Sequence, residues 1–155
     1  MCGIVGYIGE RKASPLLLEA IKKLEYRGYD SVGMACIDNK KIEIRKDIGK
    51  IKEVDQKVNF SSMLGFVGLA HSRWATHGGV TKENAHPHCN FEKNISIVHN
   101  GIIENYDELK KKLVEKGYKF CSDTDTEVIV HLIDSYYKED MKEAVIKALK
   151  EIEVK

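Results

Sequence analysis

The residue with the clearest chemical potential is Cys2, which directly follows the initiator methionine. Removal of Met1 would leave a thiol and a free α-amine on one residue, and an N-terminal amine is one of the few groups that can activate such a nucleophile. The unperturbed pKa of the amine is roughly 7.7–8.0 and that of the thiol about 8.5, so both lie near working pH. Taken alone, a cysteine at this position is ordinarily a core residue or one without a role.

Two other segments carry hydrogen-bond donors that suit a catalytic site. Arg73 ends a predicted strand, where its guanidinium could make a bidentate contact with a carboxylate, although a strand-end arginine is commonly a solvated charge. Asn100 and Gly101 could direct a side-chain amide and a backbone N–H at one developing oxyanion. Each such donor is worth about 3–4 kcal/mol in a transition state. By itself, however, Asn-Gly is also typical of a hairpin turn.

Charged residues at predicted helix ends have both a structural and a functional interpretation. Asp123 and Asp125 lie at the start of a predicted helix, where carboxylates cap the backbone and favour the dipole. Asp125 could equally hold an ammonium group. Arg27 lies at the end of another predicted helix, where a cation interacts favourably with the carboxyl-terminal dipole.

Patterns for metals and phosphate-containing cofactors are weak. His86-Pro87-His88-Cys89 resembles a set of metal ligands, but no second Cys or His pair stands at a usual zinc spacing. The sequence has no Gly-x-Gly-x-x-Gly, no Walker pattern and no serine elbow. We therefore expect no metal and no cofactor.

Composition predicts one domain without a nucleic-acid or membrane partner. The chain has 155 residues, and its 25 basic and 24 acidic residues give a net charge of +1 with no cationic run. No apolar stretch approaches the ~18–20 residues of a membrane-spanning helix, and no signal peptide is recognisable, so we expect a cytoplasmic protein. The four cysteines are widely scattered, which argues against a disulfide framework. Cys36, in an apolar run, is expected in the core.

The spacing of apolar residues predicts an α+β domain built in layers. Helices are expected at 15–25, 49–58, 106–116, 123–137 and 141–152, and strands at 4–8, 31–37, 41–46, 65–73, 95–99 and 118–120. Ser14 is expected to cap the first helix, and Gly28 to end it in a left-handed conformation. The non-periodic segment 74–90 is expected to be a functional lid. The last helix needs a partner for its apolar face, so either a neighbouring chain supplies one or the chain is a fragment.

Taken together, six ordered segments resemble class II glutamine amidotransferases. Within that family they resemble the glutaminase domains of glucosamine-6-phosphate synthases, the glutamine–fructose-6-phosphate aminotransferases. The segments are Cys-Gly-Ile-Val-Gly (2–6), Leu-Glu-Tyr-Arg-Gly-Tyr-Asp-Ser (24–31), His-Ser-Arg-Trp-Ala-Thr-His-Gly (71–78), Asn-Ala-His-Pro-His (84–88), His-Asn-Gly-Ile-Ile-Glu-Asn (99–105) and Asp-Thr-Asp-Thr-Glu (123–127). The second and third segments favour the sugar enzyme over amidophosphoribosyltransferase or asparagine synthetase.

The resemblance implies an N-terminal-nucleophile hydrolase fold, a four-layer sandwich of helices, two antiparallel sheets and helices. It implies that Cys2 attacks the side-chain amide of L-glutamine, that Asn100 and Gly101 form the oxyanion hole, and that Arg27 supports the nucleophile's surroundings. The glutamine-binding residues it implies are Arg73 for the α-carboxylate, Asp125 for the α-ammonium, Thr76, His77 and His86 in or beside the binding loop, and Trp74 in the lid.

The resemblance also implies what this chain lacks. Residues 1–155 would be a truncated glutaminase domain, incomplete at its carboxyl end, without the sugar-isomerase domains that bind fructose 6-phosphate and organise a homodimer. Two alternatives remain open at this point. The chain could be a non-catalytic module that only binds glutamine, or the glutaminase domain of another class II amidotransferase such as amidophosphoribosyltransferase.

Overall fold

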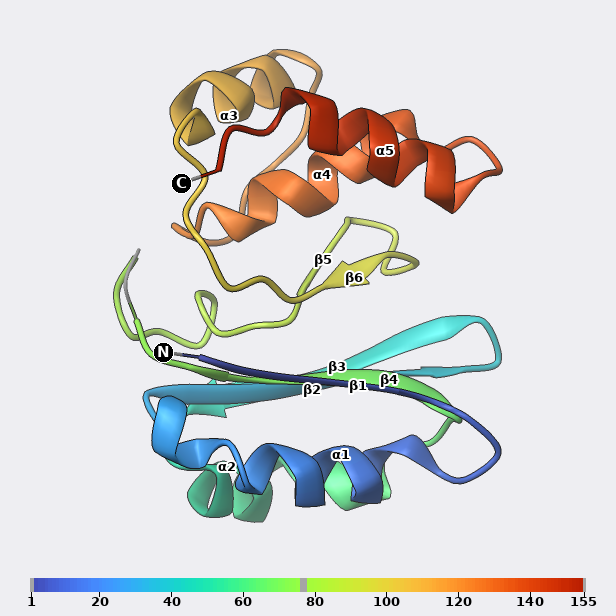
Figure 1. Ribbon diagram of the computed structural model, residues 1–155, viewed down its shortest axis with the longest axis vertical. Helices are drawn as coiled ribbons and strands as arrows, with labels where there is room; N and C mark the ends of the chain where they lie inside the picture. Colours follow the sequence, from blue (N-terminus) through green and yellow to red (C-terminus); the bar gives the residue numbers. More distant parts are fainter. Residues whose placement is uncertain (1, 76–77, 155) are drawn as a thin grey trace.

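Four layers make up the protein, as Figure 1 shows for a computed structural model that describes residues 2–75 and 78–154. Helices α1 and α2 cover one face of a four-stranded sheet, and the short β5–β6 ladder and helices α3, α4 and α5 lie over the other face. The elements are β1 (Gly3–Ile8), α1 (Ala13–Lys22), η1 (Glu25–Arg27), β2 (Ser31–Asp38), β3 (Lys41–Ile48), α2 (Ile51–Val58), η2 (Phe60–Ser62), β4 (Val67–Arg73), β5 (His88–Cys89), β6 (Ser96–Ile97), α3 (Tyr106–Glu115), α4 (Thr126–Tyr136) and α5 (Met141–Glu151).

The main sheet has the antiparallel order β1-β4-β2-β3, with β2 and β3 forming the predicted hairpin. Side chains alternate between its faces. Val32, Met34 and Cys36 of β2 enter the core beneath the sheet, as predicted for Cys36. Gly33 lies on the other face, where a Cβ would come within 2.1 Å of the His86 carbonyl oxygen. The chain of residues 85–87 therefore rests directly on the sheet.

Two separate apolar cores result from this layering. The first lies between the sheet and helices α1 and α2 and includes Leu17, Ile21 and Phe60. The second lies among α3, α4 and α5 and includes Leu113 and Val128.

The carboxyl-terminal helix finds a packing partner within the chain itself. Helix α5 packs on α4 and buries Ala144 and Ala148 completely. After α5, Val154 forms an antiparallel bridge with Ile103, and Glu104 N–H donates to the Glu153 carbonyl at 2.8 Å. The end of the chain is thus tied to the segment that follows Asn100 and Gly101.

Several local predictions were wrong. Ser14 does not cap α1, which begins at Ala13; its hydroxyl donates instead to the Met63 carbonyl at 2.7 Å. The predicted strand at 118–120 is irregular, and α4 begins at Thr126 instead of at 123. Within residues 2–75 and 78–154, no helix is long and apolar enough to cross a membrane.

Substitution of Gly33 by alanine is expected to destabilise the protein. A methyl group there would collide with backbone atoms of His86, which cannot move aside as a flexible side chain could. We expect G33A to lower the free energy of unfolding by about 1–3 kcal/mol, measured by urea denaturation. Gly6 is a matched control on β1, because a Cβ there meets no atom within 4 Å. Equal stability of G33A and G6A would contradict the proposed close packing.

Candidate functional site

Cys2 stands immediately before β1, beside the end of β4. The register of these strands pairs Gly3 with Ser72, which brings the thiol to the backbone of Trp74. Trp74 N–H donates to Cys2 Sγ at 3.2 Å, and the Trp74 carbonyl oxygen lies 3.4 Å from the same sulfur. Cys2 is half-buried. Its thiol is therefore held by the chain at the point where strand β4 gives way to the predicted lid.

Asn100 comes from the upper layer and meets the same residue. Its Nδ2 donates to the Cys2 carbonyl oxygen at 3.2 Å, and its Oδ1 lies 2.9 Å from Nε2 of His71. The Asn100-Gly101 pair joins no hairpin among the described strands. A Cβ at Gly101 would come within 2.7 Å of the His99 ring, so a larger residue there would require that ring to shift. The geometry agrees with an oxyanion site and excludes the hairpin interpretation.

Arg73 and Asp125 supply opposite charges near Cys2. Both are 4% exposed. The Arg73 guanidinium donates to the Gly79 carbonyl at 3.0 Å, and Asp125 Oδ2 accepts from the Ile103 N–H at 2.9 Å. Burial lowers the pKa of Arg73, while electrostatic interactions with Cys2, Asp30 and Asp125 oppose that shift. Asp125 makes no side-chain cap to its own helix, and its carboxylate accepts the Ile103 N–H instead.

Arg27 and Trp74 flank this region. Arg27 ends η1, and its Nε is buried without a hydrogen-bond partner in the part of the chain that the structure describes. Gly28 is extended, with φ of −174°, so the predicted left-handed cap was wrong. Glycine is needed there because a Cβ would lie 2.8 Å from the Arg73 carbonyl carbon. Trp74 is 43% exposed and meets Tyr29 edge-on, with ring centroids 5.3 Å apart.

Three histidines form a buried cluster: His71 on β4, His86, and His88 on β5. The rings of His71 and His86 are stacked with centroids 4.2 Å apart, and His86 meets His88 edge-on at 4.7 Å. Burial lowers the pKa of His71 to about 4, that of His88 to about 3, and that of His86 well below its ordinary value. All three are therefore neutral at pH 7. Thr76 and His77, also predicted to bind glutamine, lie outside the described residues.

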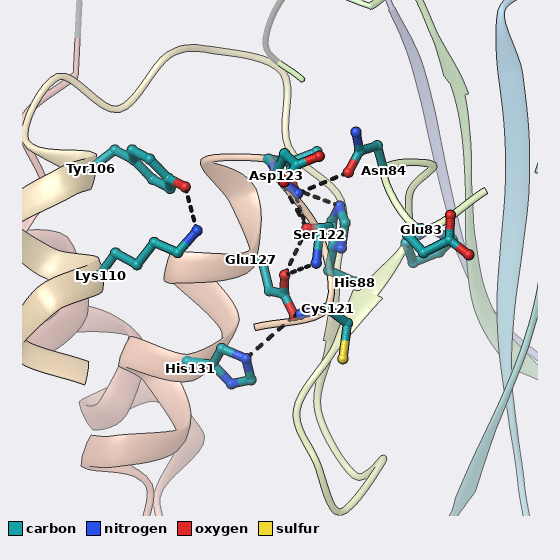
Figure 2. A network of polar contacts seen from close by, with 12 residues as sticks. Glu83, Asn84, His88, Tyr106, Lys110, Cys121, Ser122, Asp123, Glu127 and His131 are labelled. Carbon is teal, nitrogen blue, oxygen red and sulfur yellow. Dashed lines mark hydrogen bonds and ion pairs between the residues drawn. The ribbon is translucent and has the colours of Figure 1, made fainter. Parts of the chain in front are cut away.

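A polar network fixes the segment that leads to Asp125, as Figure 2 shows. Glu127 accepts hydrogen bonds from the Cys121 and Ser122 N–H groups at 2.9 and 2.7 Å and from the Ser122 hydroxyl at 2.6 Å. Ser122 in turn contacts the Thr124 hydroxyl, which lies 3.0 Å from His88 Nε2. The acidic segment 123–127 thus ties the start of α4 to the histidine cluster.

Lys46 of β3 contacts the backbone of the segment that contains His86. Its ammonium, half-buried on β3, donates to the carbonyls of Glu83, Ala85 and Pro87. Burial lowers its pKa to about 8, so it remains largely protonated at pH 7. These contacts satisfy three carbonyls of the segment that carries His86. A groove of about 1060 Å³ opens beside Lys46, but Cys2, Arg73 and Asn100 do not line it.

Sequence reasoning missed His71, His88, Lys46 and Glu127 as supports of the site. The signal for His71 was its position two residues before Arg73 on a strand, which puts both side chains on one face. No comparable signal marked Lys46, since its partners are backbone carbonyls about forty residues away. Among the residues described, no three His, Cys, Asp or Glu side chains are grouped to hold a metal ion.

Helical layers around two antiparallel sheets, with a cysteine leading into the first strand, define an N-terminal-nucleophile fold. A family model described as a glutamine amidotransferase domain matches residues 39–146. The chain belongs to this family, which confirms the resemblance and the predicted fold class.

Curated relatives narrow the comparison. The chain is 58% identical over 147 residues to glutamine–fructose-6-phosphate aminotransferase [isomerizing] of Methanococcus maripaludis, covering 95% of this chain and 24% of the relative. It is 55% identical over 153 residues to the Clostridium tetani protein of the same name, covering 99% of this chain and 25% of the relative. The chain thus spans about a quarter of the length of these relatives.

Two solved structures share the fold. Glutamine phosphoribosylpyrophosphate amidotransferase from B. subtilis, complexed with ADP and GMP, superposes with a TM-score of 0.85 at 27% identity, over 97% of this chain and 33% of that one. A structure described as the allosteric regulatory enzyme of purine biosynthesis superposes with a TM-score of 0.86 at 29% identity, over 97% of this chain and 33% of that one.

The Glu127 network predicts a specific acid sensitivity. Burial alone would raise the pKa of Glu127, but the His131 ring, whose Nε2 lies 3.6 Å from Glu127 Oε1, and hydrogen bonds from Ser122 and the Cys121 and Ser122 N–H groups lower it from 4.5 to about 2. A depressed carboxyl pKa stabilises the fold above pH 4.5, and that contribution is lost as pH falls towards 2. It amounts to about 2–3 kcal/mol.

E127Q should therefore be less stable than wild type at pH 7, and its unfolding free energy should fall less between pH 4.5 and 2. Denaturant titrations at several pH values measure both quantities. E83Q is the matched control, because Glu83 is exposed and points away from the network in Figure 2. Parallel pH profiles for E127Q and wild type would contradict the assignment.

Proposed function

We propose that this chain hydrolyses the side-chain amide of L-glutamine with Cys2 as nucleophile, and that it supplies ammonia for conversion of fructose 6-phosphate to glucosamine 6-phosphate. The observation that carries the proposal is the contact between Asn100 Nδ2 and the Cys2 backbone at 3.2 Å. It joins an amide donor from the upper layer to a cysteine at the start of the sheet. A nucleophile and an oxyanion donor are thereby adjacent.

The chemistry requires that Met1 be removed, so that the α-amine of Cys2 is free. The amine takes the thiol proton as sulfur attacks the amide carbon of glutamine, and the resulting oxyanion accepts hydrogen bonds from the Asn100 amide and the Gly101 N–H. Collapse of the tetrahedral intermediate breaks the C–N bond of the amide. The α-ammonium of Cys2 returns its proton to the leaving group, which departs as ammonia. Water activated by the same amine then adds to the γ-glutamyl thioester, and glutamate leaves as the C–S bond breaks.

Recognition of glutamine uses the two buried charges. The Arg73 guanidinium would bind the α-carboxylate and Asp125 the α-ammonium, because a zwitterion needs both signs. Thr76, His77 and His86 would lie in or beside the binding loop, with Trp74 closing over the substrate. Arg27, beside the backbone that holds Cys2, would support the surroundings of the nucleophile.

The acceptor half of the reaction is assigned from the relatives. Their names specify glutamine and fructose 6-phosphate. This chain spans about a quarter of them and carries the cysteine side of the chemistry, so we assign fructose 6-phosphate binding and homodimer formation to the remaining part of such proteins. The glutamine half-reaction is the part that residues 1–155 would perform.

Replacing Cys2 tests the proposal directly. We expect C2A and C2S to abolish release of ammonia from glutamine, because neither retains a thiol to form the thioester. Binding of glutamine, measured by calorimetry, should stay within severalfold of wild type, because Arg73 and Asp125 are unchanged. Intact mass should show that Met1 is absent from the active protein.

C121S is the matched control, since the Cys121 side chain is exposed and free, and it should retain activity. Ammonia release by C2A at the wild-type rate would disprove the proposed nucleophile. Glutamine binding by wild type without ammonia release would instead support the non-catalytic binding module.

A further inference from the structure

The side chain of His71 connects the sheet to Asn100 and has no role in the scheme above. It lies on β4 opposite Gly33 and Ile4 and is 1% exposed. Its Nε2 is 2.9 Å from Asn100 Oδ1, and its ring stacks on His86 at 4.2 Å with an interplanar angle of 18°. The ring is therefore fixed in position on one side by stacking and at its tip by the amide of Asn100.

The direction of these hydrogen bonds follows from one obligate acceptor. The Cys2 carbonyl oxygen can only accept, so the group of Asn100 that faces it must be the amide nitrogen. Asn100 Oδ1 then faces His71 and also needs a donor. His71 is neutral, because burial lowers its pKa to about 4 against the opposing effect of the Asn100 side chain and the nearby backbone of His99. The single ring proton of His71 is accordingly on Nε2.

The other ring nitrogen agrees with this assignment. Nδ1 of His71 is buried without a hydrogen-bond partner in the part of the chain that the structure describes. A proton there would be a buried donor left unsatisfied, which costs more than a buried lone pair that needs no proton. Only the Nε2–H form satisfies both Asn100 and the Cys2 carbonyl.

We propose that His71 is a positioning residue for glutamine hydrolysis, whose Nε2–H fixes the amide of Asn100 with its nitrogen facing the reacting carbonyl. Asn100 Nδ2 carries two hydrogens. One is donated to the Cys2 carbonyl, and the other is left for the oxyanion. A flipped amide would present an oxygen to that negative charge and would repel it. The hydrogen bond from His71 also polarises the amide, which strengthens its donation.

This inference rests on the proposed function, and its test uses two variants of the same residue. H71F keeps a flat ring against His86 but removes the donor, whereas H71Q keeps an N–H donor of comparable reach. We expect H71F to lower kcat for glutamine hydrolysis by at least about tenfold, with KM within about threefold of wild type. H71Q should recover most of the lost kcat. A raised KM with unchanged kcat, or equal losses in both variants, would overturn the inference.

An aldehyde analogue of glutamine separates orientation of the donor from general damage to the site. Cys2 adds to such an aldehyde and gives a tetrahedral adduct whose oxygen occupies the oxyanion position. H71F should weaken binding of the aldehyde by at least about tenfold and leave binding of glutamine by the C2A/H71F double variant close to that of C2A. Equal weakening of aldehyde binding and of glutamine binding would indicate a merely structural role and overturn the inference.

Nitrogen-15 spectra of the wild-type imidazoles give a readout that needs no activity. His71 should appear as the neutral tautomer protonated at Nε2. An Nδ1–H tautomer in a protein that hydrolyses glutamine would overturn the inference about His71 and leave the proposed function standing. Absence of ammonia release with the Nε2–H tautomer present would overturn the proposed function and the catalytic role of His71 with it.

Discussion

The site depends on a polar contact between two layers that have separate apolar cores. One core lies beneath the main sheet and the other among helices α3 to α5. Apolar burial stabilises each layer but does not specify how the two align, because hydrophobic contact is not directional. Hydrogen bonds are directional, and those of Asn100 with Cys2 and His71 set this alignment. The proposed chemistry therefore lies where the layers are joined.

Burial between the two layers explains why the histidines there are neutral. His71, His86 and His88 lie within one cluster, and desolvation lowers the pKa of each. A charged imidazole there would add to the positive charge of Arg73 in a region of low effective dielectric. Neutral rings can instead orient neighbouring amides and hydroxyls, as with Asn100 and Thr124. Two of the charges near this cluster, those of Arg73 and Asp125, are suited to a zwitterionic amino acid.

Two predictions failed because a local pattern had a tertiary partner. Ser14 before proline is a typical cap, yet its hydroxyl donates to the Met63 carbonyl across the lower layer. Gly28 is typical of a helix end, yet its missing side chain makes room for the backbone at Arg73. Asp125, for which capping was one of two interpretations, accepts the Ile103 N–H instead. In each case short-range propensity is worth about 1 kcal/mol or less, which a buried long-range contact readily exceeds.

Most helices and strands, the buried faces and the family could be predicted from the sequence, because apolar periodicity and six ordered motifs are properties of the chain in one dimension. It also supplied Cys2, Arg73, Asn100 and Asp125 as candidates from the chemistry of their side chains. The tertiary structure alone decided which of these meet and which residues orient them. His71, Lys46 and Glu127 act through partners remote in the chain or through backbone atoms, and neither distance nor backbone direction is encoded in residue type. Their roles exist only once the layers are packed.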